Sequence, residues 1–363
     1  MKATAVAPSN IAFIKYWGRK DEALRIPMNG SVSMNLSNLL TTTTVEFNKD
    51  FKEDIITINH ELLSYSSSEV SPKADESRSF SSRQDGYQMV TRQARTISLK
   101  RVVEHLNRIR KLAKINYPSA LLRAKVVSEN NFPTGTGLSS SASGFAALTL
   151  AASKAAGLSL SEKELSILAR QGSGSACRSI PDGFVEWLDG DSNKTSYAVS
   201  LFPPNYWDIV DVVAIVSKNK KELSTTEGQK LANSSPFFSV RLKRIKDKIN
   251  LIKKYIKEKN FPALGELIEQ EALELHAIML TSTPPLIYWL PATISVMHAV
   301  QKWRKDGLEV YFTVNTGQDI HLICQKKDVE TVTKRAKEIP DVKKTIINTP
   351  SIGAHIIEPS HLF

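Results

Sequence analysis

A run of glycine and serine followed at once by small apolar residues is the feature that most constrains this chain: PTGTGLSSSASGFAAL, residues 133–148. Glycine adopts backbone angles that other residues avoid, so Gly137 predicts a tight loop. The apolar run that follows Ser139, Ser140 and Ser141 predicts a helix whose first N–H groups and positive dipole end face that loop. Such a helix start favours phosphate binding, with the serine hydroxyls as further donors. The run lacks the Gly-Lys-Ser/Thr ending of a Walker loop, and a loop of this composition is about as often only structural.

Short β-branched and apolar runs alternate with helical patterns along the whole chain. The expected strands are 3–7, 31–36, 41–47, 54–59, 121–128, 184–188 and 209–217, with others near Val310, Ile320 and Ile356. The expected helices are 98–113, one ending at Gly157, one opened by the capping-box pair Ser161 and Glu164 and ending near Gly172, 239–258, 262–280, 286–305 and 328–338. The polar stretch 64–85 is expected to be a long surface loop.

The length of 363 residues allows two packed domains, because single cores stop growing well before that length. The pair Pro203-Pro204 interrupts the chain between the two groups of elements. The sequence therefore predicts an α+β protein with an N-terminal domain over 1–200 and a C-terminal domain over 201–363.

The formal net charge of +11 favours acidic partners. Much of the excess lies in residues 241–259, whose apolar positions recur every three or four residues and predict an amphipathic helix with a solvated basic face. No zinc-finger spacing or RNP-like aromatic motif supports nucleic-acid binding. No run approaches the ~20 apolar residues of a membrane helix, so no membrane partner and a cytoplasmic location are expected. The two cysteines, Cys177 and Cys324, are expected to be reduced, and the seven histidines show no metal-ligand spacing, so no metal site is predicted.

Two further stretches combine close backbone approach with cationic side chains. The first is GSGSACRS, residues 172–179, in which small residues admit a ligand and Arg178 offers a planar fork for a carboxylate or phosphate. Its alternative is a tight turn whose arginine pairs with a nearby acid. The second places Lys15 and Arg19 around Tyr16, an arrangement that suits an anionic substrate or, alternatively, an aromatic packing patch with solvated charges.

Taken together, these stretches resemble the diphosphomevalonate decarboxylases, a family of the superfamily of galactokinase, homoserine kinase, mevalonate kinase and phosphomevalonate kinase. The matching segments run in the family's order over residues 8 to about 317: PSNIAFIKYWGRKD, PMNGSVS, PTGTGLSSSASGFAAL, ARQGSGSACRS, FVEW, NSSPFF, LHAIMLTSTPP and YFTVNTG. The resemblance implies a ribosomal protein S5 domain 2-like N-terminal domain and a ferredoxin-like C-terminal domain, with the site between them.

The resemblance also implies a reaction and a set of site residues. The family phosphorylates the 3-hydroxyl of mevalonate 5-diphosphate with ATP and then releases that phosphate together with CO2. Arg178, Ser173 and Ser175 would hold the substrate carboxylate, and Tyr16 and Arg19 would contact the 5-phosphate end. Two further groups complete the implied site: Lys15 beside the reacting centre, and Gly137 with Ser139, Ser140 and Ser141 at the nucleotide phosphates.

Three positions depart from the family's pattern. Asn315 stands where the family has its catalytic aspartate, and an amide cannot accept a proton from a hydroxyl. Asp182 stands where the family has glycine, so it is either a further charged residue of the cleft, near Arg178 or Lys15, or a turn residue before Gly183. Arg19 replaces a lysine, which keeps the charge and changes the donor geometry.

The preferred interpretation is an enzyme of the mevalonate pathway that has kept elimination and lost phosphorylation, a mevalonate 3,5-bisphosphate decarboxylase that needs no cofactor and yields an isopentenyl phosphate. The alternative is an ATP- and Mg²⁺-dependent diphosphomevalonate or phosphomevalonate decarboxylase, including one in which Asn315 replaces a native aspartate. A mevalonate kinase-like or non-enzymatic protein is the minor alternative. The expected partner is a small phosphorylated substrate, and the sequence leaves a homodimer open.

Overall fold

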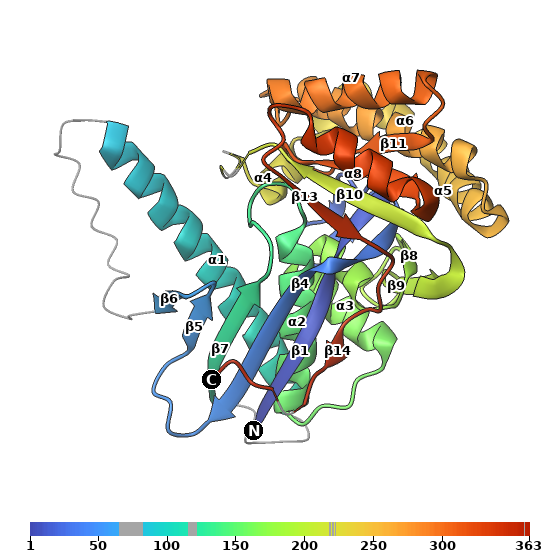
Figure 1. Ribbon diagram of the computed structural model, residues 1–363. Coiled ribbons are helices and arrows are strands. Elements are labelled where there is room, and N and C mark those ends of the chain that lie inside the picture. Colours follow the sequence, from blue (N-terminus) through green and yellow to red (C-terminus); the bar gives the residue numbers. More distant parts are fainter. Residues whose placement is uncertain (65–82, 115–121, 218, 220, 222, 359) are drawn as a thin grey trace.

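The computed structural model describes residues 1–64, 83–114, 122–217, 219, 221, 223–358 and 360–363, without the side chains of 64 and 83–96. Two sheets, each with its own helices, form two layered bodies that meet along one side (Figure 1). The expected two-domain α+β architecture is confirmed. Most of the expected strands are present in the structure. The stretch 64–85, expected as a long surface loop, lies largely outside the described residues.

An eight-stranded sheet forms the N-terminal body, in the order β14-β1-β4-β7-β5-β6, with β8 beside β4 and β9 beside β8. Threonines and alternating apolar residues suit these strands because β-branched side chains pack well on a pleated surface. The strands are β1 (Lys2–Ile14), β4 (Ser31–Asn48), β5 (Ile55–Ile58), β6 (Glu61–Ser64), β7 (Arg123–Asn130), β8 (Phe184–Trp187), β9 (Ala198–Phe202) and β14 (His355–Ile356); β2 (Arg19–Asp21) and β3 (Ile26–Pro27) pair separately.

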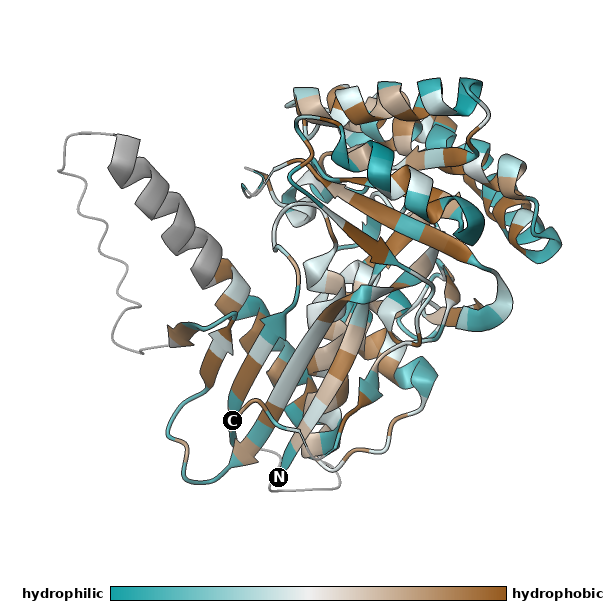
Figure 2. Ribbon diagram, in the orientation of Figure 1, coloured by the Kyte–Doolittle hydropathy of each residue, from teal (hydrophilic) through white to brown (hydrophobic). Residues whose placement is uncertain are grey.

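Three helices and one 3-10 turn pack on this sheet: α1 (Arg83–Ala113), α2 (Ser140–Ala155), α3 (Glu162–Gly172) and η2 (Gly174–Ser179). The alanines of α2 are buried against β1 and β4, so this helix lies inside the body. The capping box of Ser161 and Glu164 forms as expected at the start of α3. Figure 2 shows the apolar residues of α2 and of the neighbouring strands gathered in this layer.

The C-terminal body is a four-stranded antiparallel sheet in the order β11-β12-β10-β13, covered by long helices. Its strands are β10 (Ile209–Ile215), β11 (Val310–Thr313), β12 (Ile320–Gln325) and β13 (Lys344–Asn348), and its helices are α4 (Thr225–Lys230), α5 (Phe238–Glu258), α6 (Phe261–Leu280), α7 (Pro291–Lys305) and α8 (Val329–Lys337). α7 begins at Pro291 instead of the expected 286, because proline is favoured in the first turn, where its missing N–H is not needed.

Several strands and one helix differ from the sequence prediction because they depend on contacts with segments distant in the chain. The runs 31–36 and 41–47 form one strand, β4, because β1 pairs along its whole length. The short elements β6, β9, β13 and α4 were not predicted, since their stability depends on neighbours distant in sequence. β14 pairs with β1, and Phe363 accepts a hydrogen bond from Lys2 at 3.0 Å. The chain end assigned to the second domain therefore packs on the first.

Candidate active site

The glycine-serine loop lies at the start of α2, as its sequence predicts. Gly137 has a φ of 109° and Ser139 a φ of 57°, so the chain turns sharply just before the helix. No side chain among the described residues caps the first turn of α2, and Ser140 and Ser141 remain at least partly accessible there. The first N–H groups of α2 and two serine hydroxyls are thus available to an anion.

The C-terminal body touches this loop through its own glycine. A Cβ on Gly137 would lie 2.7 Å from the Cα of Gly317, and a Cβ on Gly317 would lie 2.1 Å from the carbonyl oxygen of Thr136. The Gln318 N–H also donates to that carbonyl, at 3.3 Å. Only glycine allows the two backbones to come this close, and the β11–β12 loop is thereby fixed beside the glycine-serine loop.

Lys15, Asn315 and Ser139 form a chain of hydrogen bonds across the junction. The Lys15 Nζ donates to Asn315 Oδ1 at 3.2 Å, and Asn315 Nδ2 donates to Ser139 Oγ at 3.1 Å. Burial lowers the pKa of Lys15 well below its usual value. His276 bonds the Asn315 carbonyl through Nε2 at 2.9 Å and stacks on Trp289. Residues from both bodies therefore meet at one point, as the resemblance implied.

Arg178 occupies a buried socket of neutral polar groups. Its Nη1 donates to Ser31 Oγ at 2.7 Å, its Nε donates to Ser33 Oγ at 3.1 Å, and its Nη2 donates to Asn10 Oδ1 at 3.0 Å. These acceptors carry no charge, and no salt bridge of Arg178 occurs among the described residues, so the alternative of an arginine paired with an acid is not what the structure shows. Each terminal nitrogen keeps an N–H beyond these bonds, which suits a two-oxygen anion.

The other residues that the resemblance implied for the substrate site include Tyr16, Arg19 and Ser173. The Arg19 Nε donates to the Tyr16 hydroxyl at 2.7 Å, and the Tyr16 ring lies 4.6 Å from that of Trp187. Burial raises the pKa of Tyr16, which keeps its hydroxyl protonated. Ser173 Oγ lies 3.2 Å from Ser141 Oγ and so connects the residue before η2 with the first turn of α2.

Ser175 belongs to the same segment. Its carbonyl accepts a hydrogen bond from Asn10 Nδ2 at 3.3 Å, and Asn10 also contacts Arg178. The structure thus brings Ser173, Ser175 and Arg178 together through η2.

Of the two alternatives for Asp182, its contacts and exposure favour the turn residue over a charged residue of the cleft. Its Oδ1 accepts a hydrogen bond from the Gly353 N–H at 2.6 Å, and its carbonyl accepts one from Ser200 Oγ at 2.8 Å. The side chain is exposed, and Gly183 follows with a φ of 70°. The carboxylate therefore secures the turn against the returning chain end, which a sequence-local pattern could not reveal.

We expect Asp182→Asn to leave turnover within about twofold of the wild-type rate, because an amide oxygen accepts the same Gly353 hydrogen bond and surface changes are usually small. Steady-state kinetics and the melting temperature check this together. A tenfold fall in turnover with an unchanged melting temperature would show that Asp182 contributes to the reaction and is more than a turn residue.

Lys221 is a site residue that the sequence reasoning missed. Its N–H donates to the Gly135 carbonyl at 3.0 Å, and its Nζ donates to Thr225 Oγ1 at 2.7 Å and to the Thr316 carbonyl. Burial lowers its pKa to about 7. The lysine-rich segment directly after the strand predicted at 209–217 was the sequence feature that could have indicated this residue. Only the fold shows that Lys221 reaches the glycine-serine loop.

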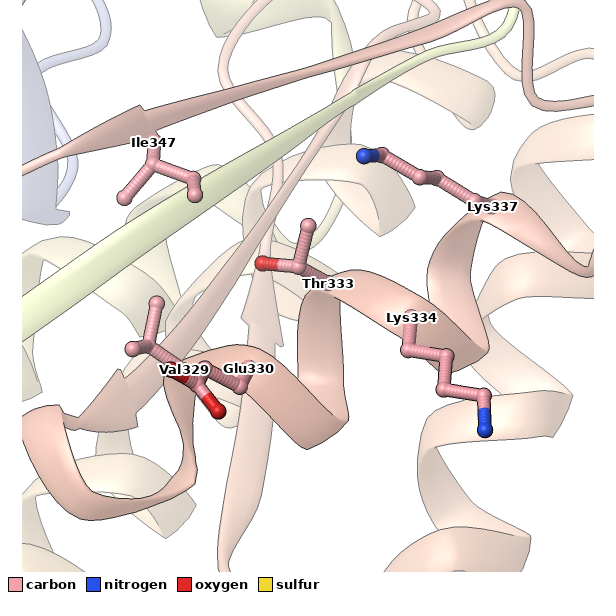
Figure 3. A pocket seen from close by; sticks show the side chains of 6 residues that line it. All are labelled: Val329, Glu330, Thr333, Lys334, Lys337 and Ile347. Atoms are coloured by element: carbon pink, nitrogen blue, oxygen red, sulfur yellow. The ribbon is translucent and has the colours of Figure 1, made fainter.

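A shallow pocket between α8 and β13 is lined by residues that include Val329, Lys334, Lys337 and Ile347 (Figure 3), none of which belongs to the candidate site. Within the described part of the chain, no three His, Cys, Asp or Glu side chains gather as metal ligands, and no helix is both long and apolar enough to cross a membrane.

Two family descriptions match nearly the whole chain. Residues 7–198 match the diphosphomevalonate decarboxylase-like N-terminal domain, and residues 211–354 match the mevalonate 5-diphosphate decarboxylase C-terminal domain. The chain belongs to the diphosphomevalonate decarboxylase family. It is therefore a decarboxylase of the mevalonate pathway, and the resemblance drawn from the motifs is confirmed at the level of the family.

Individual relatives agree with this assignment. The diphosphomevalonate decarboxylase of Debaryomyces hansenii is 32% identical over 91% of this chain and 81% of its own length. The human diphosphomevalonate decarboxylase is 33% identical over 86% of this chain and 74% of its own.

Solved structures agree as well. The mevalonate diphosphate decarboxylase of Staphylococcus aureus superposes with a TM-score of 0.83 at 34% identity, covering 98% of both chains. That of Enterococcus faecalis, described for a mevalonate diphosphate-mediated mechanism of ATP binding, gives 0.81 at 33% identity over 99% of both chains.

Proposed function

We propose that this chain removes the 3-phosphate and the C1 carboxyl group, as CO2, from a phosphorylated mevalonate and so forms an isopentenyl phosphate. The observation that carries the proposal is the buried Arg178 socket, which holds a guanidinium among neutral groups beside the phosphate-binding loop. A buried arginine without an acidic partner is unfavourable unless an anion completes the site. A substrate carboxylate is such an anion.

The geometry suits a reaction in which charges separate. As the C3–O bond breaks, its electron pair leaves with the phosphate, while the pair of the C1–C2 bond forms the C2–C3 double bond and releases CO2. In this proposal Arg178, with Ser173 and Ser175, orients the carboxylate so that the C1–C2 bond lies in line for this step. Lys15 stands near C3 and stabilises the departing phosphate.

The two ends of the substrate would be held by separate groups. Tyr16 and Arg19 would bind the 5-phosphate end, since Arg19 already orients the Tyr16 hydroxyl. Gly137 and the serines 139, 140 and 141 would bind the leaving phosphate or the phosphates of a nucleotide at the start of α2. The loop and Lys221 have the donors that nucleotide phosphates need, and ATP bound there would supply the 3-phosphate.

The relatives favour the ATP-dependent form of this reaction over the cofactor-free interpretation. The curated relatives are named diphosphomevalonate decarboxylases, and one solved neighbour holds MVAPP, AMPPCP and magnesium at a TM-score of 0.82 and 34% identity. On this ground, mevalonate 5-diphosphate with ATP and Mg²⁺ is the first candidate for the substrate and cofactor.

One observation favours a second candidate, mevalonate 3,5-bisphosphate without ATP. Asn315 Oδ1 accepts a hydrogen bond from Lys15 Nζ, and Asn315 Nδ2 donates one to Ser139 Oγ. The Asn315 amide therefore lies between Lys15 and the glycine-serine loop. The amide bridges these groups but cannot take the proton of a 3-hydroxyl. A substrate that arrives with the 3-phosphate in place needs no such proton transfer.

Two parallel incubations test the proposal. The protein is mixed with mevalonate 3,5-bisphosphate alone, or with mevalonate 5-diphosphate and Mg-ATP, and CO2 and ADP are followed. Equal amounts of ADP and CO2 in the second mixture support the first candidate, and CO2 in the first mixture supports the second. Absence of CO2 from both would refute the proposed function.

A further inference from the structure

A buried cluster of four charged side chains joins α5 and α6 beneath the candidate site. Arg241 Nη1 and Nη2 lie 2.9 and 3.0 Å from the two carboxylate oxygens of Glu271. Lys248 Nζ donates to Glu271 at 2.7 Å and to Glu274. The side chains of Arg241 and Glu271 are wholly buried, whereas that of Glu274 is 23% exposed. Arg241 and Lys248 thus face α6, although their basic helix was expected to present its charges to solvent.

This cluster holds the backbone of Lys15 from both sides. The Lys15 N–H donates to Glu271 Oε2 at 3.2 Å, and Arg241 Nη2 donates to the Lys15 carbonyl at 2.8 Å. Asn29 Nδ2 donates to the same carbonyl at 2.9 Å. One ion pair of the C-terminal body therefore binds both main-chain polar groups of the residue that follows β1.

Stability alone is a weak reason for such a cluster. Removing charged groups from water is expensive, and well-packed apolar residues often replace a buried ion pair without loss of stability. Apolar residues could not, however, bind the Lys15 N–H and carbonyl. The contact with the Lys15 backbone is the property that apolar residues in place of Arg241 and Glu271 would lose.

The same carboxylate also dominates the charges around the Lys15 ammonium. Desolvation lowers the pKa of Lys15, and among the charged groups Glu271 of α6 has the largest influence and raises it. Arg178 of η2 and Arg241 of α5 lower it, and Asp211 of β10 raises it. His276 of α6 also faces Lys15, but burial lowers its own pKa to about 3, so it is neutral near pH 7.

We propose that Glu271 is a positioning residue for Lys15: its buried carboxylate, held by Arg241 and Lys248, fixes the Lys15 backbone, places a negative charge beside it and so keeps the Lys15 Nζ next to Asn315. The consequence for turnover rests on the role proposed for Lys15 in the elimination. The effect on Lys15 itself does not depend on that role.

The test compares Glu271→Gln with the matched control Glu274→Gln. Both variants remove one carboxylate from the same cluster, but only Glu271 contacts Lys15. Protein labelled with 13C at lysine Cε is titrated by NMR, and the Lys15 signal is assigned by its loss in Lys15→Arg. We expect the Lys15 midpoint to fall by about one pH unit in Glu271→Gln and to stay nearly unchanged in Glu274→Gln.

Equal shifts in both variants, or no shift in either, would overturn the inference. The pH dependence of turnover is measured on the same proteins and answers a different question. If the NMR midpoint moves and the activity profile does not, Lys15 has no role in the reaction, while the influence of Glu271 on Lys15 stands.

Glu271→Asp provides the second variant if the glutamine variant does not fold. It keeps the charge and shortens the side chain by one methylene, so the Lys15 N–H bond lengthens. We expect the Lys15 midpoint to stay in place and turnover to fall about tenfold, because small misplacements of reacting groups are costly. Unchanged turnover in this variant, where Lys15→Arg itself loses turnover, would contradict the positioning role.

Discussion

Arg178→Lys is expected to lower turnover at least ~100-fold, a loss of about 3 kcal/mol of transition-state stabilisation. Lysine keeps the positive charge but presents a point charge in place of the planar fork that Ser31, Ser33 and Asn10 now orient. The substrate carboxylate would then lose its two-point contact and its alignment with the breaking C1–C2 bond. Steady-state kinetics on the substrate identified by the two incubations measure the effect.

Arg170→Lys is the matched control for this prediction. Arg170 is also buried, but it lies on α3 and bonds Asn193, a residue outside the candidate site. We expect the control to lose stability, because the Asn193 oxygens that accept from Arg170 would lose their donor, and to keep turnover within a few-fold of wild type. A fully active Arg178→Lys protein, or an equal loss in both variants, would remove Arg178 from the site.

Asn315→Asp is expected to raise ATP-dependent CO2 release from mevalonate 5-diphosphate at least ~100-fold, since general-base catalysis contributes a factor of about 10² to 10⁴. The new carboxylate would stand where the amide now accepts from Lys15 at 3.2 Å, beside Ser139 of the phosphate loop. It could take the proton of the 3-hydroxyl during phosphoryl transfer. ADP and CO2 are measured together, with the wild-type protein in parallel.

A second substrate serves as the control for Asn315→Asp. Mevalonate 3,5-bisphosphate has no free 3-hydroxyl, so the carboxylate should give no increase in its turnover. A wild-type protein that already releases ADP and CO2 at the rate of the variant would show that phosphorylation proceeds here without a base at position 315. The cofactor-free candidate would then be abandoned.

Local patterns in the sequence determined the parts of this protein that depend on neighbouring residues. The capping box at Ser161, the loop before α2 and the amphipathic repeat of α5 formed as predicted, because each is decided within a turn or two of helix. The motifs around Lys15 and Arg178 were specific enough to indicate the family. The segment YFTVNTG, which contains Asn315, showed where the chain departs from the family's pattern.

Tertiary structure decided what those residues touch, because the partners lie far apart in the chain. Glu271 reaches Lys15 across 256 positions, and Asp182 bonds Gly353 across 171. No local pattern distinguishes a glutamate on a solvated face from one that holds an active-site backbone, nor an aspartate in a cleft from one in a turn. Packing of α6 against the end of β1, and the return of the chain end to the first sheet, resolve these cases, since burial and hydrogen-bond partners arise only when the two bodies come together.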